Sequence, residues 1–179
     1  MSAADELFYA DGITSTGVDA VIERAGVATG SLYNNFAGKD ALIEAYLKDR
    51  DERWRTHWES CIDERTDPAE RVLALFTAVE RWFHHPVAYR GCAHLAAALE
   101  RPADHPGTRA AAAHKKHLND RLKELCTATG ATDPGDLASD LLLIYEGMSN
   151  MLAMGLDAAP MDRARILAIG RLDAQRFPN

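Results

Sequence analysis

Apolar residues recur at helical spacing along almost the whole chain. Val72, Leu75, Phe76, Val79 and Phe83, for example, mark one face at i, i+3, i+4, i+7 and i+11. No stretch alternates apolar and polar residues with the period of two that a half-buried strand requires. The pattern therefore predicts an all-α protein with about nine helices and no internal repeat.

Early in the chain, the pattern predicts two short helices joined by a tight turn. The first helix has an apolar inner face and Thr16 as its N-cap, because a threonine hydroxyl can accept a bond from a backbone N–H in the first turn. Gly26 then ends that helix, because glycine adopts a left-handed conformation without steric cost. The second helix is expected at about residues 29–36, with Leu32 and Phe36 turned inward.

The outward side of the second helix carries hydrogen-bonding groups and no charge. A short helix of this kind suits the major groove of DNA, where Asn and Thr can meet base edges. These outward residues are Thr29, Ser31, Tyr33, Asn34 and Asn35.

The same stretch resembles the helix-turn-helix of TetR-family transcriptional regulators. The resemblance rests on the run Gly26–Phe36, on Lys39 and on the apolar helix from Leu42, and it covers about residues 4–47. It implies a three-helix DNA-binding domain, operator DNA as partner, a small-molecule effector, a homodimer and a role as a repressor. The residues expected to contact DNA are Thr16, Thr29, Ser31, Tyr33, Asn34, Asn35 and Lys39.

Several of these contacts have simpler alternatives. Of Asn34 and Asn35, one is expected to face DNA, whereas the other could only solvate the end of the helix. Tyr33 could pack in the core beside Leu32, although Leu32 and Phe36 already supply the buried face. Lys39 could be an ordinary solvated lysine rather than a phosphate contact. We favour contact with DNA for both Tyr33 and Lys39.

Charge argues against strong affinity for DNA. Residues 1–46 hold seven acidic and two basic residues, a net charge of −5, and the whole chain carries −7.

In the resembled family the first helix starts earlier and follows a basic arm, whereas Met1 here falls inside that helix, so we expect either a shortened start or no arm. The alternative function is therefore a cytosolic helical small-molecule-binding protein without a DNA role.

A long helix is expected from Asp40 to about Arg65. Its middle, residues 48–53, is charged on all sides and predicts a solvated, stiff connector. We expect a DNA-binding domain at residues 1–46 and a ligand-binding and dimerisation domain at residues 47–179.

Bulky residues facing small ones in the second domain favour a ligand cavity, although plain core packing is the usual fate of such residues. The candidate pocket residues are Trp54, Trp58, Phe76, Trp82, Phe83, Cys92, His114, Tyr145 and Met148. Dimerisation is expected through the last two helices, whose apolar faces exceed the needs of one bundle. Its candidate residues are Leu137, Leu141, Met148, Met161, Ala168 and Leu172.

His114 and Cys92 have alternatives of their own. His114 is expected to be a hydrogen-bonded core histidine. The alternative is that its ring makes a polar contact with a ligand in the cavity. His114 and His117 at i and i+3 lack a further ligand at fixed spacing, so no metal site and no cofactor are predicted. Cys92 is expected to pack as a small apolar residue, with an oxidant-sensing thiol as the alternative.

The sequence excludes several classes of protein. It holds no nucleophile elbow, phosphate loop or dinucleotide fingerprint, so no catalytic residue and no enzyme are predicted. Three scattered cysteines make no disulfide framework and fit a reducing cytosol. No apolar run is long enough for a membrane span, and no secretory signal is visible, so the protein is expected in the cytoplasm.

Overall fold

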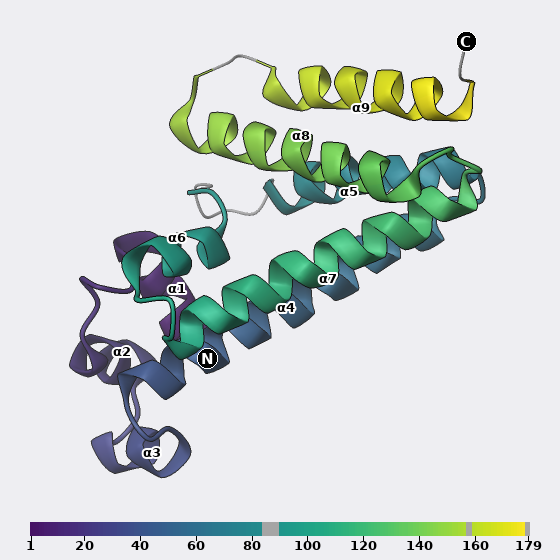
Figure 1. Cartoon of the computed structure of the whole chain (residues 1–179). Coiled ribbons are helices and arrows are strands. Elements are labelled where there is room, and N and C mark those ends of the chain that lie inside the picture. The colour runs from purple at the N-terminus through teal and green to yellow at the C-terminus, as the bar shows by residue number, and fades with distance from the viewer. Residues whose placement is uncertain (84–89, 157–158, 178–179) are drawn as a thin grey trace. The chain divides into compact units, whose positions relative to one another are not determined.

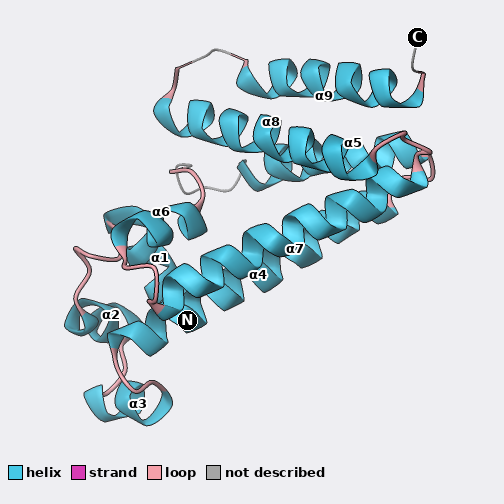
Figure 2. Ribbon diagram, viewed as in Figure 1, coloured by secondary structure: helices cyan, strands magenta, loops and turns pink. Residues whose placement is uncertain are grey.

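The computed structural model describes residues 1–83, 90–156 and 159–177, with every side chain among them except that of Phe83. These residues form nine helices and no strand, which confirms the all-α prediction (Figure 1 and Figure 2). The helices are α1 (Ser2–Asp11), α2 (Val18–Ala25), α3 (Thr29–Asn35), α4 (Lys39–Asp63), α5 (Pro68–Phe83), α6 (Ala93–Glu100), α7 (Pro106–Ala128), α8 (Pro134–Met154) and α9 (Pro160–Arg176).

The turn between α2 and α3 has the predicted glycine geometry. Gly26 lies in the left-handed region with φ 64° and donates its N–H to the carbonyl oxygen of Glu23 at 3.1 Å. Val27 then donates to the carbonyl oxygen of Ile22 at 3.4 Å. This pair of bonds is a Schellman motif, which satisfies two of the last carbonyl groups of α2 and redirects the chain into α3.

The predicted N-cap of α2 is wrong. Gly17 occupies the cap position in an extended conformation, and no side chain caps the helix. Thr16 is buried, and its hydroxyl donates backward to the carbonyl oxygens of Gly12 at 2.8 Å and Leu7 at 3.3 Å. Thr16 therefore ties the α1–α2 loop to the end of α1 instead of starting α2.

Helix α6 is shorter than expected and buries a different face. The helical spacing of Cys92, Leu95, Ala96 and Leu99 predicts a helix over about residues 89–100 with these four residues inward. Residue 89 lies outside the described residues, and Gly91 has φ 87°, which is incompatible with a right-handed helix, so α6 begins only at Ala93. The buried residues of α6 are Ala93, His94 and Ala97, whereas Leu99 is 78% exposed.

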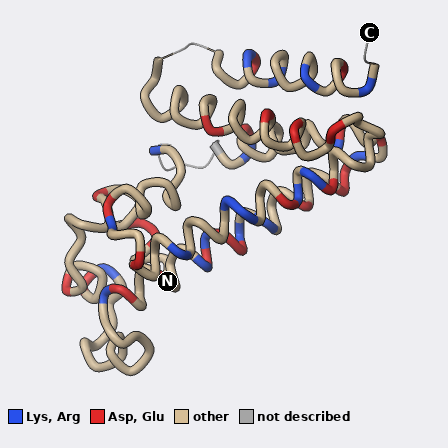
Figure 3. Tube along the Cα trace, viewed as in Figure 1, with Lys and Arg blue, Asp and Glu red and all other residues tan. Residues whose placement is uncertain are grey.

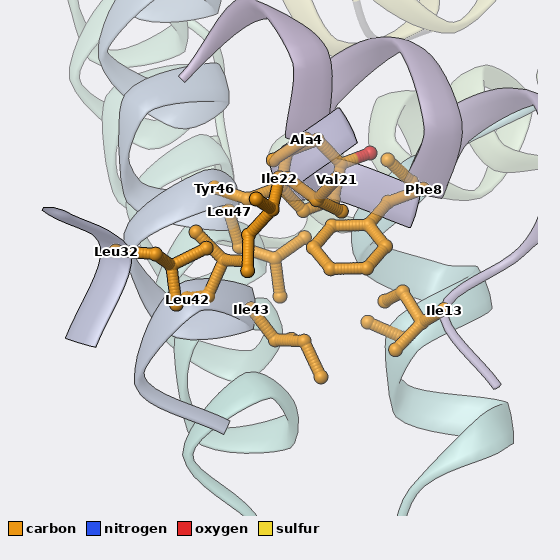
Figure 4. Packing of buried hydrophobic residues seen from close by; sticks show 12 residues of the cluster. Ala4, Phe8, Ile13, Val21, Ile22, Leu32, Leu42, Ile43, Tyr46 and Leu47 are labelled. Carbon is orange, nitrogen blue, oxygen red and sulfur yellow. The ribbon is translucent and has the colours of Figure 1, made fainter. Parts of the chain in front are cut away.

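The described chain divides into two compact units. Unit 1 comprises residues 1–54 and 92–114, and unit 2 comprises residues 55–91 and 115–179. Unit 1 thus contains α6 and the start of α7 in addition to the predicted DNA-binding domain. Its core gathers apolar residues from α1 to α4 and from α6 (Figure 4). The core residues are Ala4, Phe8, Ile13, Val21, Ile22, Leu32, Leu42, Ile43, Tyr46, Leu47, Ala93 and Ala97.

In unit 2, α8 runs antiparallel along α9 (Figure 1). Helix α5 also packs on α9. This packing corrects the predicted dimerisation face, because one protomer already buries five of its six residues to 3% exposure or less. These five are Leu137, Leu141, Met148, Ala168 and Leu172, and Met161 is half-buried. The apolar residues that remain exposed on the two helices include Leu143 at 71%, Ile166 at 69% and Leu167 at 60%.

The charged middle of α4 is not a solvated connector on all sides. The side chains of Arg50 and Asp51 are only 13% and 14% exposed. Both are held by hydrogen-bonding partners from other helices of unit 1, Arg50 by Asp5 of α1 and Asp51 by His114 of α7. Among the described helices, none is long and apolar enough to cross a membrane.

Replacing Gly26 by alanine should destabilise the protein by about 1 kcal/mol, because an L-residue is strained at a left-handed position. No atom lies within 4 Å of the added methyl group, so strain and not a clash is the cause. Gly30→Ala is the matched control. It adds a methyl group equally free of neighbours inside α3 and should stabilise by up to about 1 kcal/mol. Chemical denaturation measures the free energy of unfolding of both variants. If both substitutions change it in the same direction, this account of the turn is contradicted.

Candidate nucleic-acid interface

The outward face of α3 is exposed, polar and uncharged. Thr29, Ser31, Asn34 and Asn35 are exposed, and Tyr33 is 54% exposed. Residues 27–38 contain no charged side chain, so this part of the chain has neither blue nor red in Figure 3. The face therefore offers hydroxyl and amide groups to a partner.

The inner side of α3 is fixed by packing. Leu32 is 7% exposed and belongs to the core of unit 1, and Phe36, the C-cap residue, packs against that core while half-buried. Tyr33 takes no part in this core, so the prediction that it points outward is confirmed. Leu32 and Phe36 thus supply the buried side of this segment, and the polar residues of α3 take no part in the core.

The two asparagines of α3 differ in their local bonds. The side-chain amide of Asn35 donates to the carbonyl oxygen of Ser31 at 2.7 Å, one turn earlier. This bond satisfies a donor that would otherwise be available to a base. Asn34 is exposed at the neighbouring position, so it is the better placed of the two for base readout.

Helix α6 holds the loop that precedes α2. The backbone N–H of Thr14 donates to Oε2 of Glu100 at 2.7 Å, and Nζ of Lys39 donates to the carbonyl oxygen of Thr14 at 3.3 Å. Burial lowers the pKa of Lys39, and the positive charge of Arg101 lowers it further. The loop is thus attached at once to α4 and α6, which the sequence did not indicate.

An ion-pair cluster fixes α1 on α4. Asp5 accepts from Nη1 of Arg50 at 2.7 Å and pairs with Nη2 of Arg53 at 2.9 Å. The guanidinium of Arg50 also lies over the ring of Tyr9, 4.1 Å from its centroid. These side chains position α1 on α4. From the sequence alone, Asp5, Arg50 and Arg53 had been interpreted only as solvated charges.

Much of the acidic charge of residues 1–46 is paired. Besides Asp5, Glu6 accepts from Nε of Arg24 at 3.0 Å, and Glu44 lies 2.8 Å from Nζ of Lys48. The hydrogen bond from Lys48 lowers the pKa of Glu44. Because Lys48, Arg50 and Arg53 lie beyond residue 46, the net charge of −5 leaves out three cations that pair with acidic residues of this segment.

The predicted pocket residues are distributed over both units. Trp54, Cys92 and His114 belong to unit 1, whereas the side chain of Phe83 lies outside the described residues. His114 is buried and hydrogen-bonded, which confirms it as a satisfied core histidine. The members in unit 2 are Trp58, Phe76, Trp82, Tyr145 and Met148, of which Trp82 alone is half-buried and the others buried.

One cavity described in unit 2 involves none of these residues. Its volume is about 150 Å³, it is partly open to solvent, and its wall is polar and apolar in about equal parts. It is lined by Thr66, Pro68, Arg71, Arg121, Glu124, Leu125 and Ala128. The grouping of the nine predicted pocket residues into one site therefore stays a prediction.

Comparison with known proteins gives consistent matches. The family model described as "Bacterial regulatory proteins, tetR family" matches residues 1–46. The transcriptional regulator LmrA of Bacillus subtilis is 36% identical over 75 residues, 41% of this chain and 40% of LmrA. The transcriptional repressor KstR2 of Mycolicibacterium smegmatis is 30% identical over 78 residues, 44% of this chain and 38% of KstR2. The chain thus spans about two fifths of the curated relatives it matches.

Solved structures are similar over nearly the whole chain. A TetR-family transcriptional regulator of Streptomyces coelicolor superposes with a TM-score of 0.90 and 28% identity, over 98% of this chain and 93% of that one. A protein of Streptomyces avermitilis described as a TetR transcriptional regulator has a TM-score of 0.83 and 32% identity, over 98% of this chain and 95% of that one.

Asp5→Ala should lower the free energy of unfolding by about 2 kcal/mol, because it leaves the largely buried guanidinium of Arg50 without its carboxylate. Asp49→Ala is the control, since Asp49 pairs with Arg53 on the exposed side of α4 and should change stability by less than about 0.5 kcal/mol. Urea denaturation of the two variants measures the difference. Similar losses would mean that the Asp5 cluster does not anchor α1.

Proposed function

The chain belongs to the TetR family of bacterial regulatory proteins, and on this premise we propose that it is a DNA-binding transcriptional repressor released from its operator by a small molecule. The observation that carries this proposal is the face of α3, which is exposed, polar and uncharged while its other side is locked into a core. A helix that is rigidly held and presents only hydrogen-bonding groups suits base readout in the major groove.

Base contacts are assigned to the exposed residues of α3. Thr29, Ser31 and Asn34 can meet base edges with hydroxyl and amide groups. Asn35 contributes less, because its amide already bonds to Ser31. Thr16 is left out of the proposed contacts because its hydroxyl is buried and engaged within the protomer.

Phosphate contacts are assigned to Tyr33 and Lys39. The tyrosine hydroxyl has no role in the core of unit 1, and Lys39 stands at the first position of α4. Backbone N–H groups at the start of α4 can add to these contacts, because a helix N-terminus attracts anions. Such contacts position the protein on DNA and leave the reading of sequence to α3.

Dimerisation is assigned to the exposed side of α8 and α9. On α8, Leu143, Gly147 and Met154 follow one another at i, i+4 and i+11 and are exposed. On α9, Ile166 and Gly170 do the same at i and i+4. A Cβ atom at either glycine would meet no atom of the protomer, so packing within one protomer does not require glycine there. An apolar stripe interrupted by glycines suits close contact with the same helices of a second copy.

The effector is assigned to unit 2. Trp58 is fully buried, Ser149 is 2% exposed, and neither Nε1 of Trp58 nor Oγ of Ser149 has a hydrogen-bond partner among the described residues. A buried polar group without a partner costs free energy, which a ligand offering an acceptor and a donor would recover. Helix α4 contributes residues to both units and can couple effector and DNA by the 1–3 kcal/mol typical of such linkage.

Tyr33→Phe and Lys39→Ala should each weaken DNA binding on the order of tenfold, because each removes a hydrogen bond to a charged phosphate. Gel shifts with the DNA upstream of the protein's own gene measure this loss. Lys116→Ala is the control, since Lys116 is 76% exposed on α7 in unit 2 and should leave affinity unchanged. Equal losses of melting temperature and affinity would place Tyr33 in the core, and no shift with the unaltered protein would refute the proposed function.

Ile166→Glu should convert a micromolar dimer into a monomer, because it places a charge in the proposed apolar stripe. Sedimentation velocity measures the change. Leu99→Glu is the matched control, since Leu99 on α6 in unit 1 is an apolar residue exposed to 78%, compared with 69% for Ile166, and should leave the dimer intact. A monomeric unaltered protein, or a dimer that survives Ile166→Glu, would overturn this assignment.

A further inference from the structure

Three potential metal ligands meet in unit 1. Cys92 and His94 lie at the start of α6, and His114 lies on α7. One ligand atom from each, the sulfur and two ring nitrogens, all lie within 4.8 Å of one another. His94 and His114 are 3% and 4% exposed, and Cys92 is half-buried. Within the described chain, these residues form a compact cluster on one side of α4.

Hydrogen bonds assign a tautomer to each neutral histidine. Nε2 of His94 lies 3.1 Å from the carbonyl oxygen of Leu47, which can only accept, so Nε2 carries the proton and Nδ1 carries the lone pair. Nδ1 of His114 lies 2.6 Å from Oδ1 of Asp51, so Nδ1 carries the proton and Nε2 the lone pair. Metal-ligating histidines are oriented in this way, by a carbonyl or carboxylate on the nitrogen that does not bind the metal.

We propose that Cys92, His94 and His114 bind a divalent transition metal of the Zn²⁺ type, with Asp51 and the carbonyl of Leu47 orienting the two imidazoles. One thiolate and two imidazoles are a ligand set that zinc prefers, and a fourth position would remain for water or another ligand. The two charges of the ion would balance the Cys92 thiolate and the Asp51 carboxylate. The site goes beyond the proposed function and does not rest on it.

Closing the site requires only small movements. In a tetrahedral zinc site, bond lengths of 2.0–2.3 Å place ligand atoms about 3.3–3.6 Å apart, compared with the present limit of 4.8 Å. The rings of His94 and His114 are now stacked, with centroids 4.0 Å apart and planes 10° from parallel. They must tilt so that their lone pairs converge on the ion, which rotation about side-chain bonds provides.

Sequence spacing did not indicate this site. The pair His114 and His117 was too weak a signal, and the remaining ligands come from another helix 20 positions away or more. His94 follows Cys92 by two residues, in an alanine-rich segment that resembles ordinary core. The fold brings the two segments together because Ala93 and Ala97 bury α6 against the core of unit 1.

Titration of the 179-residue chain with Co²⁺, a spectroscopic substitute for Zn²⁺, tests the proposal. One equivalent per chain should produce ligand-field bands and a thiolate-to-cobalt charge-transfer band, both abolished by excess Zn²⁺. Zn²⁺ at a hundredfold excess over its dissociation constant should also raise the melting temperature by about 5–10 °C. Cys92→Ser should remove the charge-transfer band, and His94→Gln should weaken binding.

Matched variants separate this site from adventitious binding. Cys126→Ala and His117→Gln should leave both spectra and affinity unchanged, because burial raises the pKa of Cys126 to about 12 and His117 lies outside the cluster. Asp51→Asn should retain the charge-transfer band and weaken affinity by about 10- to 100-fold, as expected of a positioning residue. Circular dichroism verifies that each variant is folded.

The proposal is overturned if the unaltered protein gives no charge-transfer band, or if the band persists in folded Cys92→Ser. Loss of the band in Cys126→Ala would equally overturn it. Since these measurements involve no DNA, failure of metal binding leaves the proposed regulatory function untouched, and failure of DNA binding leaves the metal site untouched.

Discussion

The burial of the first turns of α4 is the constraint on which unit 1 depends. Ile43, Tyr46 and Leu47 are at most 1% exposed, and burial of each large side chain contributes about 1.5–3 kcal/mol. Helices of seven to ten residues, such as α1, α2 and α3, are too short to persist alone in water. Their existence and their orientation therefore follow from packing on α4.

Helix α4 also carries the polar bonds of unit 1. Its side chains Arg50 and Asp51 bind α1 and α7, and the carbonyl group of Leu47 binds α6. Helix α3 and the proposed metal site are consequently supported by neighbouring turns of α4.

Local patterns predicted much of this fold. Apolar periodicity located all nine helices of the described chain, and Gly26 marked the turn before α3 correctly, because both signals act within a few residues. The outward face of α3 followed from the same reasoning. Errors arose where tertiary partners decide the outcome. Thr16 bonds backward to α1, and Arg50 is buried by Asp5, 45 positions away.

The sequence did not reveal which apolar faces are buried against another helix of the same chain and which stay exposed. The apolar residues chosen for dimerisation, such as Leu141 and Leu172, fill the contact between α8 and α9 of one chain. Periodicity shows that a helix has an apolar face and does not show which neighbour covers it. Likewise, His94 and His114 meet only because α6 and α7 fold together, so no spacing rule could pair them.

In α3, the residues that pack in the core and the residues that are exposed are different ones, and this separation affects how the protein can evolve. Leu32 and Phe36 hold the helix in place, while Thr29, Ser31 and Asn34 contribute nothing to the core. Substitutions at the outward positions are therefore nearly neutral for folding. If α3 reads DNA as proposed, a lineage can exchange one preferred operator for another, one side chain at a time, without passing through an unstable intermediate. The same property makes these positions the natural place to diversify when a regulator with a new DNA preference is selected in the laboratory.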